Sequence, residues 1–276
     1  MARRTRRAPM TAPDVEIAPC TAEELMAVVA ARAVRDGQVV LVEGDGPGAV
    51  AAQLARRTHA PRTTVLDRSG AVDVRLDDGA LTERSVLDAA LTVVAPAEID
   101  GWVQAGRVDV GFVTAVQIDR HANLNATVLG EYDEPTERLP GGGATAEAAA
   151  WCGEVVVLLP HRLRSFVEQV DFVTAVGHGT GPHDRALLGL RGRGPVRVVT
   201  DLGVLEPDPE TVELVLTALH PGVDVEQVRA ETGWDLQVAP EVVTTPAPTA
   251  EELAVVRSLR PPAPGTAGDG VAGSAV

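Results

Sequence analysis

One stretch near the N-terminus passes from an apolar strand through a glycine turn and a helix into a second apolar strand. The expected strands are Val39–Val42 and Thr63–Leu66, and the expected helix is Ala49–Arg57. Two strands joined by a helix in this way pair in parallel, with a right-handed crossover. The chain is therefore expected to adopt an α/β fold.

The rest of the chain alternates between helix and strand in the same way. Capping boxes of the form Thr-x-x-Glu begin two helices, at Thr21 and Thr249. The other expected elements are three strands and one helix: Val108–Val116, Val155–Leu159, Val196–Thr200 and Val225–Thr232. No Gly/Ser-rich linker divides the middle, so one domain is expected over 16–260, with disordered tails at 1–15 and 261–276.

Composition excludes several classes of function. The 24 basic residues are all arginine, which rules out a P-loop lysine and Schiff-base chemistry in this chain. The net charge of −15 argues against nucleic-acid binding. No apolar run is long enough for a membrane span and no secretory h-region is present, so a cytoplasmic protein is expected. The two cysteines lack zinc-site spacing, and we expect no metal.

Three consecutive glycines, Gly141 to Gly143, precede Ala144 and a short Ala-rich helix. Glycines let backbone amides approach a bound group, and Thr145 is the expected N-cap of a helix over Ala146–Trp151. The amides of Gly142, Gly143 and Ala144 are thus predicted to form a cradle for an oxyanion or phosphate. The alternative is a flexible loop that ends in an ordinary capped helix.

Amide side chains follow the apolar run that ends near Val116. Gln117, Asn123 and Asn125 are expected at the exit of a strand, where α/β proteins bind ligands, and are candidate substrate-binding residues. The turn after the first strand has glycines at 44, 46 and 48, but its pattern is not GxGxxG. Dinucleotide binding is therefore the weaker interpretation, and no cofactor is expected.

Several motifs in order resemble the β subunit of family I coenzyme A transferases, with the glutaconate CoA-transferase branch the most similar. The resemblance covers about Thr21 to Leu259. It rests on these segments: Gln117-Ile118-Asp119, Asn123-Leu124-Asn125, Gly141-Gly142-Gly143-Ala144, Val170-Asp171-Phe172-Val173-Thr174, Thr200-Asp201-Leu202-Gly203-Val204-Leu205, His220-Pro221-Gly222-Val223 and Glu231-Thr232-Gly233-Trp234-Asp235-Leu236.

The resemblance implies an open, largely parallel α/β sheet with flanking helices, and an α-subunit partner that completes the active site. In such enzymes a β-subunit glutamate attacks the acyl-CoA thioester, and the glycine turn donates amides to the developing oxyanion. Coenzyme A is then part of the substrate and no separate cofactor is needed.

The chain departs from this pattern at the nucleophile. The family segment Val-Glu-Ser-Gly is matched by Asp67-Arg68-Ser69-Gly70, which places Arg68 at the position of the glutamate, beside the candidate substrate-binding residue Ser69. A guanidinium cannot attack a thioester. Three alternatives remain: Asp67 acts after a register slip, Glu43 at the end of the first strand acts instead, or the partner subunit supplies the reacting group.

Three functions therefore stay open. The first is CoA transfer between carboxylic acids. The second follows the related ring-opening hydrolases, which resemble a CoA-transferase pair but use a carboxylate from the α subunit. The third is a binding subunit without catalysis.

Overall fold

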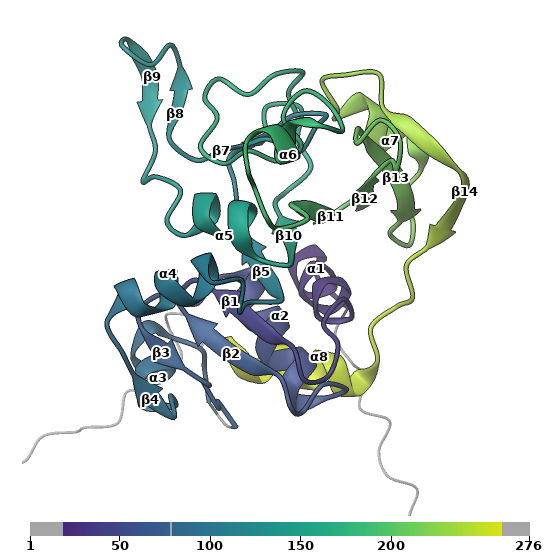
Figure 1. Ribbon diagram of the computed structural model, residues 1–276. Helices are drawn as coiled ribbons and strands as arrows, with labels where there is room; N and C mark the ends of the chain where they lie inside the picture. Colours follow the sequence, from purple (N-terminus) through teal and green to yellow (C-terminus); the bar gives the residue numbers. More distant parts are fainter. Residues whose placement is uncertain (1–18, 78, 261–276) are drawn as a thin grey trace, which may run out of the picture.

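A ten-stranded sheet forms the centre of the molecule, in a computed structural model that describes residues 19–77 and 79–260 (Figure 1). The strand order is β14-β13-β12-β11-β10-β5-β1-β2-β3-β4. The five central strands, from β11 to β2, are parallel, which confirms the predicted largely parallel α/β sheet. The strand bounds are β1 Val39–Val42, β2 Thr64–Asp67, β3 Ala71–Val72, β4 Thr92–Val93, β5 Val110–Val113, β10 Glu154–Leu158, β11 Pro195–Val199, β12 Gly203–Pro207, β13 Leu214–Leu219 and β14 Gln237–Thr244.

The predicted strand-helix-strand unit is confirmed. Strands β1 and β2 pair in parallel, and the last register pair is Val42 with Asp67. Helix α2, Pro47–Arg57, begins two residues before the expected start because Pro47 is favoured in the first turn of a helix. Strand β5 is shorter than the expected Val108–Val116, since the amide of Val116 already turns to pair with Asn125.

Helices cover the two faces of the parallel sheet, and alternate strand residues point to opposite faces. Val40 and Val42 belong to the core cluster under α1 (Ala22–Ala31), α2 and α8 (Ala250–Leu259). Leu41 belongs to the opposite cluster, under α4 (Pro96–Gln104) and α5 (Thr145–Trp151). The remaining elements are α3 Glu83–Asp88, α6 Asp184–Leu187, α7 Val225–Ala230, β6 Gln117–Ile118, β7 Leu124–Asn125, β8 Val128–Gly130 and β9 Pro135–Arg138.

The connections out of β1 and β5 run in opposite directions across the sheet. From β1 the chain passes through α2 to β2, whereas from β5 it continues to β10 by way of α5, on the other face. In open α/β sheets a reversal of this kind leaves a crevice at the carboxyl ends of the two strands, where ligands bind. A ligand site is therefore expected at the carboxyl ends of β1 and β5.

Helices α1 and α8 are joined by two reciprocal ion pairs. Both predicted capping boxes form, at Thr21 with Glu24 and at Thr249 with Glu252. Each capping glutamate also binds an arginine of the other helix: Arg257 Nε lies 2.9 Å from Glu24, and Arg32 lies 2.8 Å from Glu252. The same carboxylates thus begin two helices and dock them against each other.

The tails expected at 1–15 and 261–276 lie outside the described residues. No described helix is long and apolar enough to cross a membrane.

We expect Glu24→Gln to lower the free energy of unfolding by about 2 kcal/mol near neutral pH, because a buried charge-assisted hydrogen bond is lost. The hydrogen bond from Arg257, aided by the Thr21 backbone amide, holds the pKa of Glu24 below its ordinary value. The ionised carboxylate therefore stabilises the fold above the ordinary glutamate range, and this contribution disappears as the pH falls through the lowered pKa.

The difference between the two proteins, measured by urea unfolding, should shrink in acid. Glu23→Gln is the control, because Glu23 is 82% exposed in its pair with Arg260 and should change stability by less than about 0.5 kcal/mol. A difference that stayed constant down to acid pH would contradict the assignment.

Candidate active site

The glycine turn before α5 presents free backbone amides. The amides of Gly142, Gly143 and Ala144 donate no hydrogen bond to a described residue. Thr145 was expected to cap the helix, and this was wrong. Its own amide donates to the Gly142 carbonyl at 2.7 Å, so Thr145 is the first helical residue, and Ala144 stands at the N-cap without a side-chain bond. The turn is closed by backbone alone, and three adjacent amides are left available.

The carboxylate of Glu43 lies directly against this turn. Gly143 has a φ of +50°, and a Cβ atom added there would overlap both carboxylate oxygens of Glu43. Glu43 follows the last residue of β1, is exposed, and makes no hydrogen bond or ion pair with another described residue. Nearly a hundred residues of chain separate the two, and tertiary structure alone brings an unpaired carboxylate to the free amides.

Asp67, the other candidate carboxylate, is committed to the backbone. It is 1% exposed, its Oδ2 accepts from the amide of Gly44 at 2.8 Å, and its Oδ1 accepts from the amide of Ser69 at 2.8 Å. These bonds tie the turn after β1 to the end of β2. Asp67 thus shapes the site, and neither of its oxygens is free to react.

Glu43 lines two cavities, and a third shares two lining residues with one of them. The first, the β1–β5 crevice, has a volume of about 180 Å³ and lies between the ends of the two strands. Its lining residues are Glu43, Gly46, Pro47, Gly48, Ala49, Phe112, Val113 and Thr114. Gly48 is required here, because a Cβ atom at this position would overlap the side chain of Phe112.

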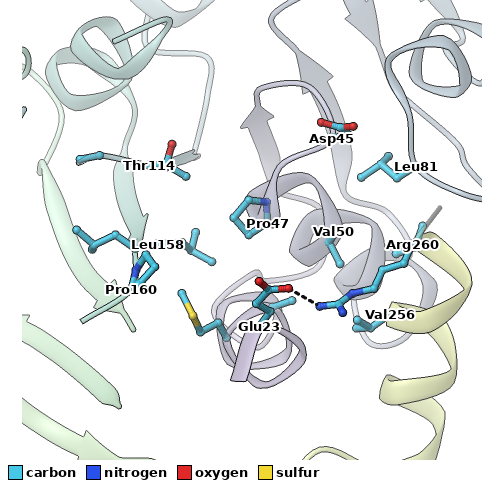
Figure 2. A pocket seen from close by; sticks show the side chains of 15 residues that line it. Glu23, Asp45, Pro47, Val50, Leu81, Thr114, Leu158, Pro160, Val256 and Arg260 are labelled. Atoms are coloured by element: carbon cyan, nitrogen blue, oxygen red, sulfur yellow. Dashed lines mark hydrogen bonds and ion pairs between the residues drawn. The ribbon is translucent and has the colours of Figure 1, made fainter. Parts of the chain in front are cut away.

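The second, which we call the Arg68 cavity, has a volume of about 500 Å³ and shares Glu43 with the crevice. The third, the apolar cavity, has a volume of about 410 Å³ and shares Pro47 and Thr114 with the crevice. Figure 2 shows the apolar cavity, with the ion pair of Glu23 and Arg260 at one side and Asp45 at another. The crevice and the Arg68 cavity thus both reach Glu43, and the apolar cavity continues from the crevice at Pro47 and Thr114.

Arg68 follows the last residue of β2, as Glu43 follows the last residue of β1, at the carboxyl ends of the two strands. Its amide donates to the carbonyl of Val42 at 3.1 Å, which extends the parallel pairing of β1 and β2 by one step. Its Nε is 3.8 Å from Asp100 Oδ1, too far for a hydrogen bond, and its side chain is 30% exposed. Ser69, another predicted site residue, also lines the Arg68 cavity.

The three predicted amide side chains are largely occupied by contacts within the chain. Gln117 binds Asp171 and accepts from Asn125, which is fully buried and also donates to the Val128 carbonyl. Asn123 donates to Asp119 at 2.9 Å and accepts from the amides of Gly177 and Gly179. Their role in substrate binding stays a prediction. The structure shows that they hold together the loops after β5.

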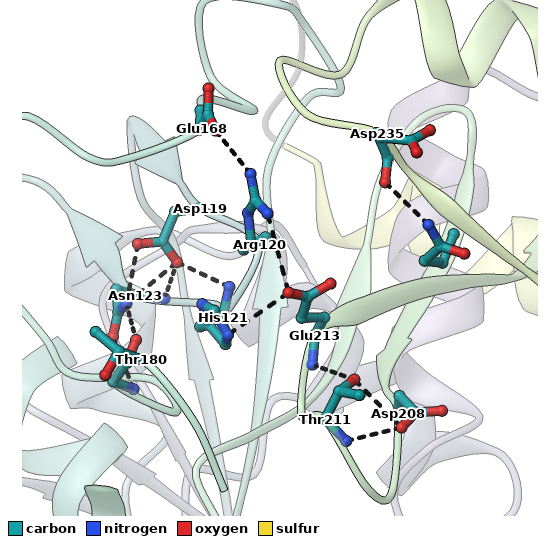
Figure 3. A network of polar contacts seen from close by, with 12 residues as sticks. Asp119, Arg120, His121, Asn123, Glu168, Thr180, Asp208, Thr211, Glu213 and Asp235 are labelled. Carbon is teal, nitrogen blue, oxygen red and sulfur yellow. Dashed lines mark hydrogen bonds and ion pairs between the residues drawn. The ribbon is translucent and has the colours of Figure 1, made fainter.

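A separate polar network surrounds Asn123 (Figure 3). Burial raises the pKa of Asp119, whose carboxylate accepts from Asn123 and from the amide of His121. Arg120 binds Glu168 at 2.9 Å, and His121 Nε2 lies 3.9 Å from Glu213. Among the described residues, no three histidine, cysteine or acidic side chains gather in a way that could hold a metal ion.

Two fully buried titratable residues, His161 and Cys152, lie in the interior of the protein. His161 stacks on Phe166 and binds Thr232, and burial lowers its pKa to about 4. Burial likewise raises the pKa of Cys152 to about 12. Neither group is ionised near neutral pH, and neither lines a cavity around Glu43.

The family model for coenzyme A transferases matches residues 23–231, which is most of the chain. The chain belongs to the coenzyme A transferase family. It is 43% identical, over 86% of its length and 92% of the relative's, to the B subunit of the 3-oxoadipate CoA-transferase of Pseudomonas knackmussii.

Two further relatives of this coenzyme A transferase family member are named for different activities, one a transferase and the other a hydrolase. The crystal structure of glutaconate CoA-transferase from Acidaminococcus fermentans superposes with a TM-score of 0.80 at 29% identity, covering 87% of this chain and 95% of that chain. The cholesterol ring-cleaving hydrolase IpdB subunit of Mycobacterium bovis is 29% identical over 88% of this chain and 95% of the relative. The predicted family resemblance is confirmed.

For this coenzyme A transferase family member, we expect Asp67→Asn to lower the free energy of unfolding by about 1–3 kcal/mol, because the amide group turns a donor toward a backbone N–H that needs an acceptor. Asp45→Asn is the matched control, since Asp45 is exposed in the same turn and has no hydrogen bond to a described residue. Urea unfolding compares them. Equal stabilities would show that Asp67 does not hold the turn.

Proposed function

We propose that this chain is the β-type subunit of a two-subunit enzyme that transfers coenzyme A between carboxylic acids, and that Glu43 is its reacting carboxylate. The observation that carries the proposal is the contact between Glu43 and Gly143. A carboxylate without a partner lies against Gly143, in a turn whose amides have no acceptor, at the crevice where the fold favours ligand binding. These are the two groups that attack on a thioester requires, a nucleophile and an oxyanion site.

The register of the sheet explains how Glu43 can replace a residue at position 68. Val42 pairs with Asp67 in parallel, so positions 43 and 68 follow neighbouring strands side by side. Adjacent strands are about 4.8 Å apart, a distance that a glutamate side chain can span. A carboxylate at the end of β1 therefore reaches nearly the same space as one at the end of β2. We infer that the nucleophile has moved by one strand.

In the proposed reaction the Glu43 carboxylate attacks the thioester carbonyl of acyl-CoA. The oxyanion that forms accepts hydrogen bonds from the amides of Gly143 and its neighbours, and the C–S bond breaks to leave an acyl-glutamyl anhydride and the CoA thiolate. The thiolate then attacks the glutamyl carbonyl, which releases the free acid and forms a glutamyl-CoA thioester. A second carboxylic acid repeats these steps in reverse and leaves as its CoA thioester.

Relatives support both the reaction and a partner subunit. Two of them are named as CoA-transferases, and the Pseudomonas knackmussii relative is named as one subunit of its enzyme, so we expect an α subunit to complete the site. A cytoplasmic enzyme agrees with Cys20 and Cys152, which are unpaired. The second candidate is hydrolysis with the nucleophile supplied by the partner, which Arg68 and the ring-cleaving relative favour.

Trapping the covalent intermediate distinguishes the two. The complex with its α subunit is incubated with acyl-CoA, then treated with borohydride or hydroxylamine, and the modified peptide is mapped by mass spectrometry. We expect modification at Glu43, and we expect Glu43→Gln to lower kcat by at least about a thousandfold, because an amide cannot form the anhydride.

The control is Glu98→Gln, because Glu98 is an exposed carboxylate of α4 that lines none of the three cavities, and this variant should retain turnover within a few-fold. Turnover without an adduct on any carboxylate of this chain would assign the chemistry to the partner. If the assembled complex binds acyl-CoA but shows no turnover, this chain is a binding subunit without catalysis.

A further inference from the structure

The guanidinium of Arg68 is free to bind a ligand. No hydrogen bond joins its side chain to a described residue, and its nearest carboxylate, Asp100, is 3.8 Å from Nε. Arginines that are fixed within the fold have much closer carboxylates, as Arg162 has in Asp201 at 2.7 Å and Arg197 in Glu206 at 2.6 Å. Arg68 therefore carries a permanent charge and a fork of N–H donors that no acceptor fills.

Arg68 and Glu43 line the same cavity. Its apolar wall comes from Val86, Leu87 and Pro96, and its polar groups come from the ends of β1 and β2 and from Glu83 of α3. Asp67 lines it too, but its oxygens are held by backbone amides. Arg68 is the only cation among the described residues that line this cavity, and the acidic residues that line it are Glu43, Asp67 and Glu83. Asp100, outside the lining, is the carboxylate that pairs with Arg68 at 3.8 Å.

We propose that Arg68 is a specificity residue, whose guanidinium binds a second carboxylate at the far end of the acyl group of the CoA thioester. This rests on the proposed function, since it takes the thioester to react at Glu43. With the carbonyl at Glu43, an acyl chain that enters the Arg68 cavity meets the guanidinium, because both residues line that cavity from the ends of neighbouring strands. Arginine matches a carboxylate with two parallel hydrogen bonds, which the distant Asp100 does not use.

The position of Arg68 also explains why this residue is compatible with catalysis at Glu43. An arginine at the end of β2 would be useless as a nucleophile, but one strand from the reacting carboxylate it can fix the far end of the substrate. Binding energy at a remote group then orients the thioester for attack. The ends of two neighbouring strands thus divide the work between reaction and recognition.

The test compares two unreactive CoA thioethers, S-(4-carboxybutyl)-CoA and S-pentyl-CoA, which have the same chain length and differ in the terminal carboxylate. Their dissociation constants are measured by calorimetry on the assembled complex. Arg68→Met should weaken binding of the carboxyl ligand about tenfold to a hundredfold and change the pentyl ligand by less than about twofold. Because neither ligand can react, the result does not depend on which residue is the nucleophile.

Two further variants separate recognition from a structural effect. Arg68→Lys should recover only part of the preference, since an ammonium group lacks the planar fork. Asp100→Asn should strengthen binding of the carboxyl ligand severalfold, because it removes a competing charge. Equal weakening of both ligands by Arg68→Met, or no change in either, would overturn the proposal even if Glu43 proves to be the nucleophile. Loss of the Glu43 adduct with the ligand preference intact would overturn only the proposed reaction.

Discussion

The parallel pairing of β1 with β2 determines where every group of the candidate site lies. Val42 opposite Asp67 sets Glu43 beside Arg68 at the carboxyl edge of the sheet. The same register brings Asp67 under the turn that follows β1, where it accepts from the amide of Gly44. A slip by one residue would turn each of these side chains to the opposite face. The proposed reaction, the proposed recognition and the support of the turn thus depend on one ladder of backbone hydrogen bonds.

Close contacts at two glycines complete this arrangement. Gly48 lets α2 approach Phe112 of β5, which keeps the crevice between β1 and β5 narrow. Gly143 lets the turn before α5 meet the carboxylate of Glu43. Both contacts join parts of the chain that are distant in sequence, and both are possible because glycine has no Cβ atom. The site is assembled from elements on both faces of the sheet.

Local patterns predicted the elements well. The strand-turn-helix-strand unit, both capping boxes and the glycine turn are encoded by neighbouring residues, so their outlines follow from the sequence. The contact between Glu43 and Gly143 joins distant parts of the chain. The sequence indicated only that Glu43 lies at a strand end. Thr145 was misplaced because the Gly142 carbonyl had already closed the turn. The spacing of Gln117 and Asn125 predicted only that they follow a strand. It could not predict that the loops after β5 bring the two side chains into contact with each other.

The central claim is that the reacting carboxylate has moved from the end of β2 to the end of β1. The most direct measurement is made on the double variant Glu43→Gly, Arg68→Glu, with the single variant Glu43→Gly as reference, in the complex with the α subunit. Borohydride trapping and peptide mapping locate the acyl adduct. If the claim is right, the single variant forms none, while the double variant forms an adduct at position 68 and regains turnover with monocarboxylic acyl-CoA. Full turnover in Glu43→Gly alone, without an adduct in this chain, would contradict it.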